Sequence, residues 1–126
     1  MDDATLRNGL RAIAALTVVT GGVQATAPRR LLEPLAAEND AATQHLFGTL
    51  GMFMVVVGGG LGATLRRGPG DPDVVMWAGV QKVGASGAVG LGVKRGVFAP
   101  LALAVAGFDL LSGVLAFAYW RRLRRG

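Results

Sequence analysis

The sequence predicts an all-α fold, an integral membrane up-down-up-down four-helix bundle that forms one domain over residues 1–126. Hydrophobic residues make up 52% of the chain, and they gather in four runs of about 20 residues. A helix of about 20 apolar residues spans the roughly 30 Å hydrocarbon layer of a bilayer. Arginine clusters and short turns separate the runs, which is typical of neighbouring antiparallel membrane helices. The predicted spans are residues 9–27, 46–65, 74–93 and 100–120.

The first span is predicted to belong to a longer helix that Asp2 or Asp3 caps, because aspartate is favoured at helix N-termini. Residues 28–40 form the one long connection, and Pro34 limits any helix within it. Three leucines on one side of this connection predict a short helix lying in the membrane interface, namely Leu31, Leu32 and Leu35.

The later helices have start signals of their own. Asn39 or Asp40 is the expected N-cap of the helix that contains the second span. Asp71 followed by Pro72 predicts an N-cap and a first-turn proline for the third helix. Pro100 is expected to open the fourth helix.

The distribution of basic residues predicts that both termini lie in the cytoplasm. Lysine and arginine are enriched on the cytoplasmic side of membrane proteins. With the N-terminus inside, eight flank the spans on the inner side and four on the outer side. The inner eight are Arg7, Arg11, Arg66, Arg67, Arg121, Arg122, Arg124 and Arg125, and the outer four are Arg29, Arg30, Lys94 and Arg95.

Several classes of site are excluded by composition. The chain has no cysteine and one histidine, His45, which rules out disulfides, Cys-based zinc sites and a His-rich metal site within one copy. We therefore expect no metal and no cofactor. The net charge of +5 comes from arginines at helix ends rather than from a continuous basic face, so we expect no nucleic-acid partner. The glycine-rich stretches lack a phosphate-loop pattern.

The third and fourth spans each carry one ionisable residue near the middle, Lys82 and Asp109. Counted from the same side of the membrane, the two differ in depth by only about 3 Å at 1.5 Å per residue. Small residues share the face of each side chain, which lets membrane helices approach closely. The sequence therefore predicts that Lys82 and Asp109 meet inside the bundle, since a charge facing lipid is costly.

Three roles for this pair are open. The pair can be structural and fix the register of the helices. It can be catalytic, with Asp109 as acid or base and Lys82 stabilising developing negative charge on a lipophilic substrate, as in an isomerase or cyclase. It can also serve a proton-coupled transporter, although the positive neighbour keeps Asp109 ionised.

Four further polar residues are candidate ligand contacts. His45 and Gln24 lie near the outer ends of their spans and are expected to share a polar mouth. Ser86 and Ser112 lie on the same helix faces as Lys82 and Asp109. Small-residue spacings at Gly58-x-x-x-Gly62 and Gly84-x-x-x-Ala88-x-x-x-Gly92 predict close helix packing, within one copy or in a homo-oligomer.

The layout resembles that of the small DoxX-like bacterial membrane proteins. The likeness rests on four short helices, the Pro28-Arg29-Arg30 loop, the His45–Gly48 start of a glycine-rich span, and the Lys82/Asp109 pair. It implies the fold and a bacterial inner membrane location, and it adds little on activity. The leading hypothesis is a membrane protein that binds a lipophilic small molecule or acts as an accessory subunit, with the lipid bilayer as its surroundings.

Overall fold

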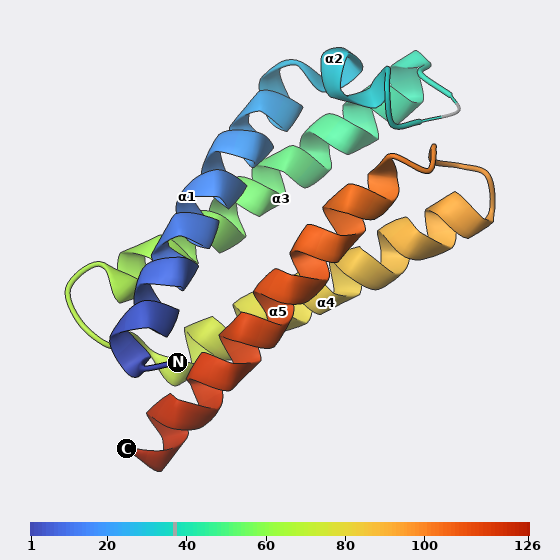
Figure 1. The fold of residues 1–126 in the computed structure, drawn as a ribbon. Helices are drawn as coiled ribbons and strands as arrows, with labels where there is room; N and C mark the ends of the chain where they lie inside the picture. Colours follow the sequence, from blue (N-terminus) through green and yellow to red (C-terminus); the bar gives the residue numbers. More distant parts are fainter. Residues whose placement is uncertain (37) are drawn as a thin grey trace.

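The computed structural model describes residues 1–36 and 38–126, and this part of the chain is mainly helical, with five α-helices and no strand (Figure 1). The all-α fold and a long helix at each of the four apolar runs are confirmed. The long connection contains one short helix, α2, and residue 37 of that connection lies outside the described residues. The helices are α1 (Asp3–Thr26), α2 (Pro28–Leu32), α3 (Ala41–Leu65), α4 (Pro72–Lys94) and α5 (Ala102–Arg125).

Aspartate caps open three of the four long helices, as the sequence predicts. The carboxylate of Asp2 accepts a hydrogen bond of 2.7 Å from a backbone N–H of the first turn of α1. Asp40 does the same for α3 at 2.8 Å, and Asp71 for α4 at 2.8 Å, with Pro72 as the first helical residue. These hydrogen bonds satisfy backbone N–H groups that have no partner within the helix at its N-terminus.

The start of α5 differs from the prediction. Pro100 lies in a turn that precedes the helix rather than at its first residue. The backbone bonds around it join residues three apart, from Ala102 to Ala99 and from Leu103 to Pro100, so this turn is tighter than an α-helical one. At its other end α5 continues past Trp120 to Arg125, because arginine favours helices.

The long helices form two antiparallel pairs, α1 with α3 and α4 with α5 (Figure 1). Both chain termini and the α3–α4 loop lie at one end of the molecule, which we call the terminal end. The opposite end, called the loop end, holds α2 and the connections to α3 and α5. The two pairs share one apolar core toward the terminal end, made of Leu6, Leu10, Ile13, Ala14, Leu61, Leu65, Val75, Ala78, Ala116 and Tyr119.

Polar contacts reinforce the terminal end. The Arg11 guanidinium donates to the carbonyl of Leu65 at 2.8 Å and so pairs an acceptor that the C-terminus of α3 leaves free. The Tyr119 hydroxyl donates to the carbonyl of Pro69 at 2.6 Å. Arg122 pairs with the carboxylate of the first residue of α1 at 2.9 Å. Side chains from α1 and α5 thus hold the ends of neighbouring helices.

Glycine allows α1 and α3 to touch backbone to backbone. A Cβ atom placed on Gly21 would lie 2.6 Å from the carbonyl oxygen of Gly51, and one on Gly51 would lie 2.6 Å from that of Gly21. Gly58 also faces α1, where a Cβ would lie 3.0 Å from Thr17. The predicted close packing around Gly58 therefore occurs within one copy. A Cβ on Gly84 would meet no atom within 4 Å.

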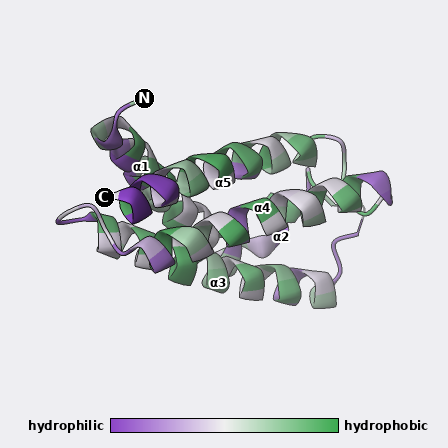
Figure 2. Ribbon diagram, turned by 90° about the horizontal axis from the view of Figure 1, so that it is seen from below, coloured by the Kyte–Doolittle hydropathy of each residue, from purple (hydrophilic) through white to green (hydrophobic). Residues whose placement is uncertain are grey.

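The surface between the two ends is apolar. Helices α3 and α5 are long and apolar enough to cross a membrane, judged by length and composition. Large hydrophobic side chains are more than half exposed on the surface of each pair, such as Val19, Phe53 and Leu111. Figure 2 shows the hydrophilic residues gathered mainly at the chain termini and helix ends, with hydrophobic residues along the helices between them.

Candidate functional site

Lys82 and Asp109 meet between α4 and α5, as their depths predict. The ammonium nitrogen of Lys82 lies 3.6 Å from a carboxylate oxygen of Asp109. The Lys82 side chain is 4% exposed and that of Asp109 is 13% exposed. The predicted small-residue faces surround the pair, because Gly79 on α4 and Gly113 on α5 are both buried in the contact between these helices.

Thr17 on α1 is a third member of the site. The Lys82 ammonium donates to the Thr17 hydroxyl oxygen at 2.7 Å, and this hydroxyl donates in turn to the carbonyl of Ile13 at 2.8 Å. Thr17 is 2% exposed. We call Lys82, Asp109 and Thr17 the Lys82 cluster. It joins three helices, and it ties the α1–α3 pair to the α4–α5 pair near the middle of the bundle.

Reasoning from the sequence missed Thr17, although a signal was present. Thr17 lies eight residues from the start of the first predicted span, and Lys82 lies eight residues from the start of the third. At equal rise per residue, these two residues lie at the same depth. The depth comparison that pairs Lys82 with Asp109 therefore also selects Thr17, once it is extended to hydroxyl side chains on the other helices.

The surroundings of the pair are mostly apolar. The Phe108 ring lies 5.9 Å from the Lys82 nitrogen, a distance at which a cation is attracted to the face of an aromatic ring. One turn beyond Asp109, Ser112 is buried and its hydroxyl has no hydrogen-bond partner among the described residues. In such surroundings each charge depends on its few polar neighbours, and the Thr17 hydroxyl and Asp109 carboxylate are those of Lys82.

The other candidate residues divide into two groups. Ser112 and Ser86 lie one turn along their helices from the charged pair, with Ser112 buried and Ser86 half-buried. Gln24 and His45 lie far from it, at the loop end. The Gln24 amide donates to the carbonyl of Phe47 at 2.9 Å and so joins α1 to α3. His45 is exposed and lines a shallow, open hollow of about 500 Å³.

A larger cleft of about 530 Å³ also lies at the loop end. Neither this cleft nor the hollow beside His45 is lined by Lys82, Asp109 or Thr17. The Lys82 cluster joins α1, α4 and α5 through direct side-chain contacts. Among the described residues, no group of three or more His, Asp or Glu side chains could hold a metal ion.

Near the loop end, the first turn of α3 lowers the pKa of one carboxyl group, that of Asp40. The backbone N–H of Thr43 donates to Asp40, and this hydrogen bond lowers the pKa of the Asp40 carboxyl below its ordinary value. Asp40 therefore stays ionised at neutral pH and favours the N-terminus of α3 through its negative charge.

No family model, curated protein or solved structure matches this chain.

Proposed function

We propose that this chain is a four-span integral membrane protein of the bacterial cytoplasmic membrane, with both termini in the cytoplasm, and that it binds a lipophilic molecule or serves as an accessory subunit. Helices α1, α3, α4 and α5 are the four spans. A relationship to the small DoxX-like bacterial membrane proteins, whose layout this chain resembles, is part of the same proposal.

One observation carries the membrane assignment: several polar side chains, one of them charged, are buried, while large hydrophobic side chains are exposed. The side chains of Thr17, Gln24, Lys82 and Ser112 are buried, while large hydrophobic side chains of α1, α3, α4 and α5 are exposed. A water-soluble bundle of this size places charges outside and apolar residues inside. In a lipid bilayer, exposed apolar side chains can face the acyl chains without cost. An ionisable side chain is costly there unless it finds a partner inside the protein.

The Lys82 cluster has a structural role in this proposal. It provides Lys82 with a carboxylate and a hydroxyl in a layer that excludes water, and it fixes the two helix pairs relative to each other. The proposed ligand site is the cleft at the loop end, which opens between α3 and the α4–α5 loop. Its volume lies within the range of about 300–1,000 Å³ that small molecules occupy in proteins.

Single cysteines test the membrane assignment well because the chain has none of its own. Arg67→Cys and Arg95→Cys form a matched pair, since both arginines are exposed and lie at opposite ends of the bundle. We expect both variants to stay in the membrane pellet after alkaline carbonate extraction. A membrane-impermeant maleimide should label Arg95→Cys on intact cells, and Arg67→Cys only after permeabilisation.

Two results would refute this proposal. Release of both variants by carbonate would remove the membrane assignment. Labelling of Arg67→Cys rather than Arg95→Cys on intact cells would reverse the orientation.

A membrane enzyme is the second candidate, and it is favoured by the buried Ser112 hydroxyl, which has no hydrogen-bond partner among the described residues. A buried donor without a partner, one turn from a carboxylate, is an arrangement that a polar group of a substrate would complete. Lipid extracts of cells that produce the wild type or Asp109→Asn test this reading by mass spectrometry. An enzyme would yield a product that disappears in the variant, whereas identical extracts would exclude acid–base chemistry at Asp109 on cellular lipids.

A further inference from the structure

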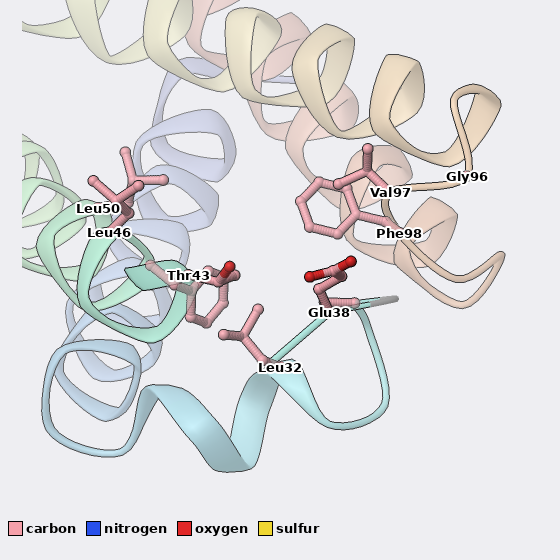
Figure 3. A pocket seen from close by; sticks show the side chains of 10 residues that line it. Leu32, Glu38, Thr43, Leu46, Leu50, Gly96, Val97 and Phe98 are labelled. Atoms are coloured by element: carbon pink, nitrogen blue, oxygen red, sulfur yellow. The ribbon is translucent and has the colours of Figure 1, made fainter. Parts of the chain in front are cut away.

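The cleft at the loop end has walls from three separate segments. One wall is the start of α3, a second is the connection between α2 and α3, and the third is the α4–α5 loop (Figure 3). Most of its lining is apolar, and it includes Leu32, Leu46, Phe47, Leu50, Val97 and Phe98.

The walls are fixed to each other. The backbone N–H of Ala99 donates to the carbonyl of Leu35 at 2.8 Å, and Ala36 pairs with Phe98 in an antiparallel bridge. Leu32 is fully buried beneath the connection. Main-chain bonds thus join the α2–α3 connection to the α4–α5 loop, and the cleft lies between these two segments and the start of α3.

The apolar walls are large and uncovered. Leu46, Leu50 and Val97 are each more than half exposed although they line the cleft. An alkyl chain can lie along them, as lipid acyl chains do along the other exposed apolar side chains of the proposed membrane bundle, so the preference among ligands comes from the polar group.

One acidic group interrupts this apolar lining. Glu38 projects from the α2–α3 connection toward Val97 and Phe98 (Figure 3). Among the described residues, it belongs to none of the ion pairs, whereas the neighbouring Glu33 pairs with Arg29 at 3.5 Å. The basic residues at this end lie outside the lining, namely Arg29, Arg30, Lys94 and Arg95. Glu38 is exposed, and it is the one charged side chain among the described residues that line the cleft.

We infer that this cleft binds a lipophilic amine, a molecule with a long alkyl chain and a protonated amino group. The chain lies along Leu46 and Leu50, and the ammonium group donates to the Glu38 carboxylate. A carboxylate accepts stronger hydrogen bonds from a cation than from a neutral hydroxyl group, so the amine is preferred over an alcohol of equal length. This inference rests on the proposed function, because a membrane location supplies the lipophilic ligand.

Competition binding tests the inference with the full chain purified in a non-ionic detergent. Radiolabelled hexadecylamine is bound at pH 7 and displaced by unlabelled hexadecylamine, hexadecan-1-ol or hexadecanoate at a constant micelle concentration. We expect the wild type to prefer the amine over the alcohol by about tenfold, the factor that one added charge-assisted hydrogen bond provides.

Three variants assign the effect to the cleft. Glu38→Gln should bind amine and alcohol equally, because it keeps the shape and removes the charge. Glu33→Gln is the matched control and should keep the tenfold preference, since Glu33 does not line the cleft. Leu50→Trp should weaken the binding of both molecules several-fold, because the larger side chain fills the space between the walls.

The inference is overturned if the wild type shows no displaceable binding, binds the alcohol or the carboxylate as well as the amine, or keeps its preference in Glu38→Gln. The labelling of Arg95→Cys separates this failure from that of the proposed function. A chain that resists carbonate and labels from outside, yet shows no amine preference, refutes the ligand alone. A chain that carbonate releases refutes the membrane assignment as well.

Discussion

Replacing Lys82 with methionine should strongly destabilise the protein. Methionine has a similar length, so it keeps the packing of α4 but leaves Asp109 without its cation. Removing one partner of a buried ion pair costs about 3–5 kcal/mol. Because the Asp109 side chain is 13% exposed, we expect a loss near the lower bound, at about 3 kcal/mol.

The double variant separates pairing from charge. Lys82→Met together with Asp109→Leu removes both charges and leaves no unpaired ion, so its stability should return to within about 1 kcal/mol of the wild type. Thr17 still donates to the carbonyl of Ile13 in that variant, so its hydroxyl keeps one bond. Ser86→Ala, one turn along the same helix, is the control and should change stability by less than about 0.5 kcal/mol.

The free energy of unfolding is measured by titrating sodium dodecyl sulfate into detergent micelles and following helicity by circular dichroism. The reasoning is refuted if Lys82→Met is as stable as the wild type. It is also refuted if the double variant is as unstable as Lys82→Met, because the loss would then come from packing and not from an isolated carboxylate.

Three other changes have defined outcomes. Gly51→Ala should lower the free energy of unfolding by about 1–3 kcal/mol in the same titration, because the added Cβ would overlap the α1 backbone. Gly59→Ala is the control, because a Cβ at Gly59 meets no atom within 4 Å, and this variant should be neutral or slightly stabilised. Tyr119→Phe removes the hydrogen bond to the α3–α4 loop and should lower the free energy of unfolding by about 1 kcal/mol. An unchanged titration midpoint would contradict this expectation. The lowered pKa of Asp40 means that its capping contribution is complete above the unfolded-state pKa and is lost as the pH falls through the lower folded-state pKa. The amide proton signal of Thr43 should therefore titrate in acid below the ordinary aspartate range in the wild type, and a similar titration in Asp40→Asn would contradict the assignment.

The helices themselves were predictable because their signals are local. Apolar runs of sufficient length set the four long helices, and Asp40, Asp71 and Pro72 mark where two of them begin. The meeting of Lys82 with Asp109 was also predictable, because a short loop forces α4 and α5 to run antiparallel and depth then follows from counting residues. Each of these inferences needs only neighbouring stretches of the chain.

The rest depends on how distant segments pack. Thr17 reaches Lys82 only because α1 crosses the α4–α5 pair, and no local pattern gives that crossing. Gln24 lies at the loop end with His45, and its amide donates to the carbonyl of Phe47 on α3, a backbone contact that the residue types do not indicate. The cleft beside Glu38 comes from two connections that meet through main-chain bonds, which carry no side-chain signature.

The uneven placement of the shared core predicts a gradient of rigidity along the bundle. The two helix pairs are sealed by ten buried apolar side chains toward the terminal end, whereas at the loop end main-chain contacts between two connections hold them. Segments with few buried contacts open first in the native state. Hydrogen exchange should accordingly be faster in the backbone amides beside the cleft than in those of the shared core.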